Sequence, residues 1–326
     1  DFVLPGNGGL AIEIKRNYTS LQPSSWPDYT AVGAGWTMHF GWVEITDIEK
    51  MCSPLWSISI MDNPMVHMPD GSSDVLALTD EPMADPTKIH YRGKSGVGVS
   101  CGAVVVGDNA APFIMVTPDG RRYEFERWSV GGALFGFNKT AKWFVKKIQD
   151  RHGNWISIDY QDVGSPATGT IVAPVRVLGS DGREVVLEYA DGLLRRIVQG
   201  TDTLVEYGYE AADMDTGHYS NLVRVELREE LAWTYSYSAK RDAGAGSMVR
   251  ATNPFGGYTD YTWRRQYFLT GDDAELNAVV AQVTQDAVGS PSATWLYTYT
   301  PATAVGARDV TTVVAPEGTY QYSHFS

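Results

Sequence analysis

Residues 175–197 read VRVLGSDGREVVLEYADGLLRRI, and their pattern is the strongest indication of the fold class. A β-branched run leads into the turn at Asp181-Gly182, and an alternating run then ends at Tyr189. A second pair, Asp191-Gly192, follows and leads into another β-branched run. Asp-Gly pairs favour tight turns between strands because both residues tolerate a positive φ angle. The stretch therefore predicts two consecutive β-hairpins.

The same unit recurs along the second half of the chain, with copies spaced about 20 to 35 residues apart, as in repeat proteins. In an earlier copy, Gly153 and Asn154 set the turn and the following strand ends in Tyr160. A single hairpin cannot bury its face in water, whereas stacked hairpins form one long sheet. We expect one tyrosine of each unit to stack between neighbouring units: Tyr160, Tyr189, Tyr209, Tyr237, Tyr261 and Tyr299.

Alternation of period two is found in most strand-like segments. Residues 233–237 place two tyrosines and a tryptophan on one face, and residues 295–299 repeat this pattern. Such aromatic stripes indicate either a buried sheet face or a platform for a sugar or a polypeptide. Residues 272–281 form the only plausible short helix, although Val279-Val280 suits a strand equally well. The sequence therefore predicts an all-β fold of antiparallel hairpin repeats.

Composition excludes several classes of protein. The 326 residues are 43% hydrophobic, which is too apolar for a disordered chain. The 39 acidic residues outnumber the 26 basic ones, so we expect no nucleic-acid partner. The longest apolar runs have the length of strands, so we expect no membrane span. The chain begins at Asp1 and ends in a strand-like run, so we interpret it as part of a larger polypeptide.

The chain has two cysteines, Cys52 and Cys101, with no Cys-x-x-Cys pair. They are either two buried thiols or one disulfide, and we favour the disulfide. A loop of about 50 residues closed by a disulfide contributes roughly 3–4 kcal/mol to stability. Such a bond forms in an oxidising compartment, which is consistent with a secreted or cell-surface protein.

No motif predicts catalysis, a metal site or a cofactor. Gly98-Val-Ser100-Cys-Gly102 fits the pattern around a nucleophilic serine, but a strand-like run follows it where a helix is required. We therefore expect a glycine-rich turn beside the disulfide and keep a serine hydrolase as the weakest hypothesis. The six histidines have no metal-ligand spacing.

The repeats resemble those of the Rhs, or YD-repeat, family, whose unit pairs Asp-x-x-Gly with a following tyrosine. Residues 150–160, 180–189 and 191–197 carry this pattern. The amino-terminal run from Leu4 to Ser20, followed by Gly33-Ala-Gly-Trp36, is similar to the first segment of long Rhs proteins. Relatives in that family include the cocoon subunits of insecticidal Tc toxins and the cell-adhesion teneurins.

The resemblance implies a spiralling β-sheet that forms part of a hollow shell around a carboxy-terminal polypeptide, often a toxin. It divides the chain into an amino-terminal β-rich capping region, residues 1–140, and hairpin repeats, residues 141–326. The expected function is a non-enzymatic shell segment whose partner is the carboxy-terminal remainder of the same polypeptide. The alternative is an adhesion or carbohydrate-binding module that uses exposed aromatic residues on a cell-surface protein or glycan.

Overall fold

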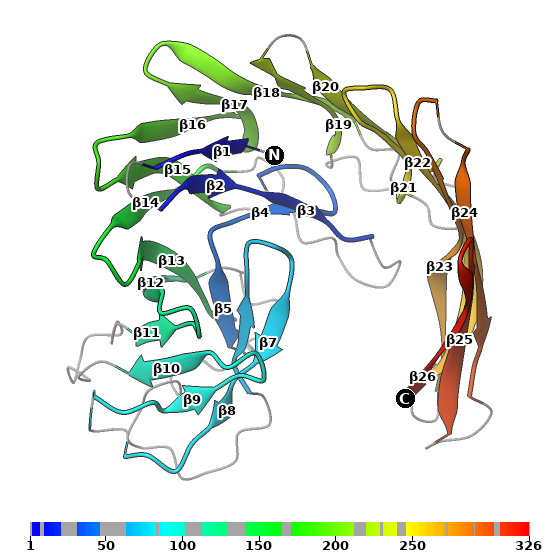
Figure 1. Ribbon diagram of the computed structural model, residues 1–326, viewed down its shortest axis with the longest axis horizontal. Coiled ribbons are helices and arrows are strands. Elements are labelled where there is room, and N and C mark those ends of the chain that lie inside the picture. The colour runs from blue at the N-terminus through cyan, green and yellow to red at the C-terminus, as the bar shows by residue number, and fades with distance from the viewer. Residues whose placement is uncertain are drawn as a thin grey trace. The chain divides into compact units, whose positions relative to one another are not determined.

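The computed structural model describes residues 2–6, 10–20, 31–45, 63–82, 85, 87–101, 113–129, 141–164, 171–211, 220–228, 231–239, 246–270, 273–289, 291–302 and 307–325. This part of the chain consists of β-strands and turns, with no α-helix, which confirms the predicted all-β class (Figure 1). The strands are β1 (Phe2–Leu4), β2 (Ile12–Ile14), β3 (Arg16–Tyr18), β4 (Trp36–Met38), β5 (Trp42–Ile45), β6 (Met65–His67), β7 (Ser73–Val75), β8 (Ala77–Leu78), β9 (Tyr91–Arg92), β10 (Gly98–Cys101), β11 (Phe113–Val116), β12 (Arg122–Ser129), β13 (Ala141–Gln149), β14 (Trp155–Asp162), β15 (Val172–Gly179), β16 (Glu184–Ala190), β17 (Leu193–Gln199), β18 (Asp202–Ala211), β19 (Ser220–Leu227), β20 (Ala232–Tyr237), β21 (Met248–Thr252), β22 (Tyr258–Thr270), β23 (Asp273–Asp286), β24 (Ala293–Thr300), β25 (Arg308–Ala315) and β26 (Gly318–Phe325).

The chain forms two compact units. Unit 1 comprises Asp1–Asn17 and Thr37–Thr203, and unit 2 comprises Tyr18–Trp36 and Leu204–Ser326. Each unit therefore combines a piece of the amino-terminal segment with a sheet of later strands. The division into a capping region, residues 1–140, and hairpin repeats, residues 141–326, rests on the sequence pattern and stays a prediction.

In unit 1, consecutive strands from β9 to β17 pair antiparallel, and β13 is a branch point (Figure 1). Residues 141–144 of β13 pair with β5, whereas residues 147–149 pair with β14. From β5 the pairings continue through β6 to β7, and β8 pairs with β9. Strands β5 to β12 are thereby joined to the first hairpin repeat through β13.

One face of the unit 1 sheet is apolar and the other carries charge. Ile158, Val177 and Val185 lie in register across β14, β15 and β16 and are fully buried. On the opposite face Arg176 forms an ion pair with Glu184 at 2.6 Å. The separate two-stranded β1–β2 sheet contributes Ile12 and Ile14, which are also buried.

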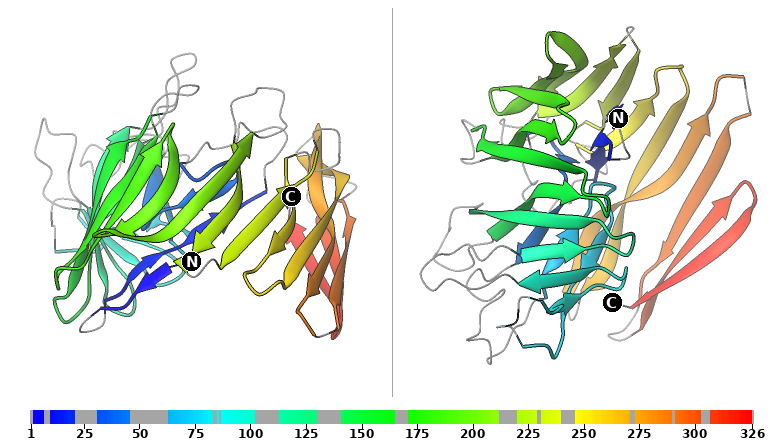
Figure 2. Two further views of the ribbon diagram at one scale, coloured as in Figure 1. Left: turned by 90° about the horizontal axis from the view of Figure 1, so that it is seen from above. Right: turned by 60° about the vertical axis from the view of Figure 1, so that its left-hand side comes forward.

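In unit 2, strands β18 to β26 pair in sequence order and antiparallel (yellow to red in Figure 2). β22 and β23 are the longest, and their pairing runs from Tyr258↔Asp286 to Thr270↔Asp273. The helix predicted over residues 272–281 is therefore wrong, because residues 273–281 lie in β23. Val280 pairs with Trp263 across the two strands, and this long-range pairing outweighs the weak helical pattern.

The turn between β13 and β14 is organised by one aspartate side chain. The Asp150 carboxylate accepts hydrogen bonds from the backbone N–H groups of His152 at 2.8 Å and Asn154 at 2.9 Å. Asn154 returns a side-chain hydrogen bond to Asp150 at 2.8 Å. A short polar side chain thus organises the turn, and a residue of positive φ closes it. The predicted turn residues with positive φ are Gly153 (88°), Gly182 (84°), Asp191 (55°) and Gly192 (74°).

Candidate functional site

Aromatic side chains of the repeats form a regular series of hydrogen bonds to the backbone. The hydroxyl of Tyr160 donates to the carbonyl of Val145 at 3.0 Å, and that of Tyr189 donates to Pro174 at 2.7 Å. In both cases the acceptor lies 15 residues before the donor. Three further bonds belong to this series: Tyr237 to Leu222 at 2.6 Å, Trp263 to Met248 at 2.8 Å and Tyr299 to Val280 at 3.0 Å.

A β-bulge explains each of these acceptors. Pro174 pairs with Tyr160 where the register shifts between Asp159 and Tyr160, and its carbonyl accepts from Tyr189 of the next repeat. A bulge interrupts the backbone ladder locally, so a side-chain donor can satisfy the carbonyl there. Each of the other acceptors also pairs across the strands with an aromatic residue, and a register shift lies directly before that aromatic residue. The pairs are Val145 with Phe125, Leu222 with Tyr209, Met248 with Tyr237 and Val280 with Trp263.

The tyrosines predicted to stack between repeats match this series of donors only in part. Tyr160 is buried, and Tyr189, Tyr209, Tyr237, Tyr261 and Tyr299 are half-buried. In the repeat that contains Tyr261, however, the donor to the backbone is Trp263. The signal that could have identified it is its spacing of 15 residues from Met248, which Tyr160, Tyr189 and Tyr237 also have from their acceptors, whereas Tyr299 lies 19 residues after Val280. Burial raises the pKa of Tyr160 and Tyr299 above the ordinary value, so both phenols remain protonated donors at neutral pH.

Part of this face is covered in unit 1 by the amino-terminal segment. The Arg183 guanidinium donates to the carbonyl oxygens of Leu4 at 2.6 Å, Pro5 at 2.9 Å and Leu10 at 2.9 Å. Asp181 accepts from Arg183 Nε at 2.6 Å, and the arginine side chain is only 17% exposed. The predicted turn residue Asp181 therefore orients an arginine that fastens the β1–β2 segment to the turn between β15 and β16.

In unit 2, Tyr18 and Trp36 of the amino-terminal part of the chain lie on one face of the sheet formed by the later strands. Trp36 donates through Nε1 to the hydroxyl of Tyr237 at 2.9 Å, and its ring lies 4.8 Å from that of Tyr235. The Tyr18 hydroxyl accepts from the backbone N–H of Met248 at 2.8 Å, and burial raises its pKa to about 12. An extended segment with aromatic side chains is thus held on this face by packing and by hydrogen bonds.

Beyond β21 the same face continues across β22, β24 and β26 with aromatic residues. Cross-strand register places Tyr297 beside Val313 and Tyr320, and Tyr299 beside Tyr322 through Thr311. Tyr320 is 43% exposed and Tyr322 is 52% exposed. We call this surface the aromatic face; its residues are Tyr261, Trp263, Trp295, Tyr297, Tyr299, Tyr320 and Tyr322.

The predicted cysteine pair lies partly outside the described residues. Cys101 ends β10 and is fully buried, whereas Cys52 is not among the residues described. The disulfide therefore stays a prediction. Ser100 lies within β10 and pairs with Ile114 of β11, so the expected glycine-rich turn is wrong at residues 98–101. These four residues also lack the strand-to-helix turn that a nucleophilic serine requires.

The described residues contain no cluster of three or more histidine, cysteine, aspartate or glutamate side chains able to hold a metal ion. In the same part of the chain, no helix is long and apolar enough to cross a membrane.

Comparisons with known proteins identify similar solved structures. No family model matches the sequence, and no curated protein matches it. The crystal structure of TcdB2-TccC3-Cdc42 is 13% identical and covers 99% of this chain, with a TM-score of 0.48. The N-terminal domain of the effector protein SpvB from Salmonella typhimurium strain LT2 is 12% identical over 99% of both chains, with a TM-score of 0.35. The Photorhabdus luminescens Tc holotoxin pore is 12% identical over 98% of this chain, with a TM-score of 0.45.

This chain spans 21% of the first of these structures and 20% of the third. Tc toxins are also among the relatives to which the sequence motifs point. Because the TM-scores are below 0.5 and the identities are 12–13%, these likenesses do not identify a function for the chain.

Proposed function

We propose that this chain is a non-enzymatic wall segment of an Rhs-type shell that encloses the carboxy-terminal polypeptide of the same protein. The observation that carries the proposal is the aromatic face. In unit 2 one part of the sheet face is covered by Tyr18 and Trp36, and the adjoining part across β22 to β26 is aromatic and half-exposed. A surface of this kind suits a polypeptide that is held without a unique fold.

The chemistry of the aromatic face supports weak contact with many sequences. Tyrosine and tryptophan present large apolar rings together with a hydrogen-bonding group, and few rotatable bonds are lost on contact. Exposed apolar surface beyond what an ordinary protein displays marks an interaction site. The proposed shell belongs to a secreted or cell-surface protein, and its role requires no cofactor and no catalytic residue.

Protease protection of the complete natural polypeptide tests the proposal. We expect its carboxy-terminal part to resist digestion while the shell is folded. The variant Tyr297→Ser/Tyr320→Ser/Tyr322→Ser removes rings from the aromatic face, and we expect its carboxy-terminal part to be digested faster. The control Leu296→Ser/Val314→Ser changes exposed apolar residues of the opposite sheet face in β24 and β25. Equal digestion of the natural protein and of a separately expressed carboxy-terminal part contradicts enclosure.

The exposure of Tyr320 and Tyr322 also favours a second candidate, an adhesion module that stacks sugar rings on these side chains. Titration of this chain with glycans, followed by tryptophan fluorescence, distinguishes the two. Saturable quenching that is lost in Tyr320→Ser/Tyr322→Ser supports glycan binding. An unchanged spectrum across a panel of glycans opposes it.

A further inference from the structure

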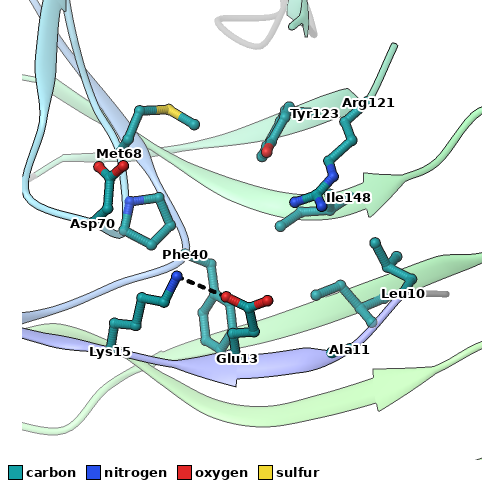
Figure 3. Close-up of a pocket in the computed structure, with 12 residues that line it drawn as sticks. Leu10, Ala11, Glu13, Lys15, Phe40, Met68, Asp70, Arg121, Tyr123 and Ile148 are labelled. Atoms are coloured by element: carbon teal, nitrogen blue, oxygen red, sulfur yellow. Dashed lines mark ion pairs between the residues drawn. The ribbon is translucent and has the colours of Figure 1, made fainter. Parts of the chain in front are cut away.

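A hollow of about 170 Å³ lies in unit 1 where the amino-terminal segment crosses the sheet (Figure 3). Its apolar wall is formed by Phe40, Tyr123, Ile148 and Ile156, all of which are buried, together with Met68. The wall therefore draws on residues from the beginning of β12, the end of β13 and the beginning of β14. The hollow is partly open to solvent and is lined by charged as well as apolar groups, and its volume exceeds the roughly 150 Å³ that holds one benzene ring in an enclosed cavity.

Charged groups stand around the hollow, and each already has a partner in the protein. Lys15 forms an ion pair with Glu13 at 2.7 Å, drawn as the dashed line in Figure 3. Arg121 is paired with Asp119 at 3.2 Å, and Asp70 accepts a hydrogen bond from Ser72 Oγ at 2.6 Å. The lining charges of Glu13, Lys15, Asp70 and Arg121 sum to zero. A neutral ligand therefore enters without leaving a buried charge unpaired.

In unit 2 the place where the amino-terminal segment lies on the sheet is occupied by aromatic rings of the chain itself. The amino-terminal segment itself supplies two of these rings. The ring centroids of Tyr18 and Trp36 are 5.2 Å apart, and the Trp36 ring packs against that of Tyr235. In unit 1 the segment presents Glu13 and Lys15 to the hollow. Thus the crossing in unit 2 is filled by aromatic side chains of the chain itself, whereas the crossing in unit 1 retains a hollow of ring size.

We propose that this hollow is a subsite for one aromatic side chain, phenylalanine or tyrosine, presented by a bound polypeptide. The ring packs against Phe40, Ile148 and Ile156, and the Met68 thioether and the Arg121 guanidinium contact its edge and face. For the source of that side chain, the held polypeptide, the assignment rests on the proposed function. The subsite is a specific anchoring position within unit 1.

Methyl NMR on the whole chain tests the subsite. Isoleucine and methionine methyl groups are labelled, and N-acetyl-phenylalaninamide is added as the probe. We expect the signals of Met68, Ile148 and Ile156 to shift and to saturate, while Ile197 and Met248 stay unchanged. N-acetyl-alaninamide, which lacks the ring, is the matched control probe, and we expect it to cause no shift.

A variant that fills the hollow completes the test. Ala11 lines the hollow, so Ala11→Trp places a ring there and is expected to weaken probe binding at least tenfold. Ala190→Trp introduces the same residue at an exposed position of β16 and is expected to leave binding unchanged. If Ala11→Trp disturbs the methyl spectrum as a whole, Ala11→Leu gives the same test with a smaller group.

Two results overturn the subsite: no saturable shift at Met68, Ile148 and Ile156, or equal binding to Ala11→Trp and the natural chain. Because the probe is a free small molecule, the outcome does not depend on enclosure of a cargo. Protease protection can thus fail while the subsite stands, and the subsite can fail while protection is observed.

Discussion

The hydroxyl of Tyr189 donates a 2.7 Å hydrogen bond to the carbonyl of Pro174, the residue that pairs with the preceding repeat's tyrosine across a β-bulge. Proline has no N–H to offer the ladder, so a position beside a bulge suits it. The carbonyl at that position gains a side-chain donor from the next hairpin. At five places along the chain a hairpin therefore completes the backbone hydrogen bonding of an earlier one, and these hairpins stabilise one another.

Removing one phenolic hydroxyl from the series tests this coupling. Tyr160 is buried and its hydroxyl is bonded to Val145, so Tyr160→Phe leaves a buried carbonyl without its donor. We expect a loss of about 1–3 kcal/mol in the free energy of unfolding, measured by urea denaturation. Tyr160→Ala also creates a cavity, and we expect it to cost roughly 3–5 kcal/mol.

The control for this prediction is Tyr322→Phe, which alters a half-exposed hydroxyl in β26. We expect its effect to stay within about 0.5 kcal/mol, the usual size of a surface change. Equal effects of Tyr160→Phe and Tyr322→Phe contradict the coupling.

Loss of the Arg183 side chain is expected to release the amino-terminal segment. Arg183→Ala removes the donor of three backbone carbonyls, at Leu4, Pro5 and Leu10. We expect a destabilisation of roughly 2–3 kcal/mol and faster proteolytic cleavage within residues 1–17. Arg250→Ala breaks a half-exposed ion pair with Asp260 and is the matched control. Its expected cost is much smaller than that of Arg183→Ala because exposed ion pairs contribute little to stability, and similar cleavage of both variants contradicts the role of Arg183.

Acidification is expected to destabilise unit 1 through His39. Burial, with the nearby charges of His67 and Lys142, lowers the pKa of His39 to about 4, and Asp70 opposes this shift. The Gly41 N–H donates to His39 Nδ1 at 3.1 Å, which requires an unprotonated nitrogen. Since the folded pKa is below the unfolded one, this contribution is complete above about pH 6.5 and is lost as pH falls toward 4.

The expected loss through His39 is up to about 3 kcal/mol. His39→Gln should flatten the stability profile between those pH values. Profiles that coincide for the natural chain and His39→Gln would show that other groups carry the acid sensitivity.

The hairpins were predictable because their signals are local. Asp181-Gly182 and Asp191-Gly192 set turns within a few residues of the strands they join, and both glycines adopt positive φ. The aromatic donors were predictable only in part. The sequence indicates Tyr261, but the bulge between Thr262 and Trp263 directs Trp263 to the backbone. No single residue type specifies a bulge, so its position depends on how two strands pair.

The contacts of the amino-terminal segment could not be predicted from the sequence. Arg183 bonds to Leu4 across a separation of 179 residues, and neither residue type signals the other. The hollow beside Glu13 and Tyr123 likewise depends on how the segment crosses the sheet. The alternation of apolar and polar residues predicts that the sheet has an apolar face. Which segment covers that face depends on tertiary packing.

The predicted disulfide can be tested directly by thiol labelling. We expect neither Cys52 nor Cys101 to react with an alkylating reagent in the unfolded, non-reduced chain. Reduction should then expose both thiols and lower the free energy of unfolding by roughly 3–4 kcal/mol. Labelling of both residues before reduction contradicts the bond, and Cys101→Ala supplies the single-thiol control.

Electron microscopy of the complete natural polypeptide tests enclosure. We expect a closed wall with density inside it, in contact with the aromatic face of β22, β24 and β26. Deleting the carboxy-terminal part should remove that density and leave the wall unchanged. A particle without an internal space, or one whose aromatic face points to the surrounding solvent, would contradict enclosure and favour the adhesion role.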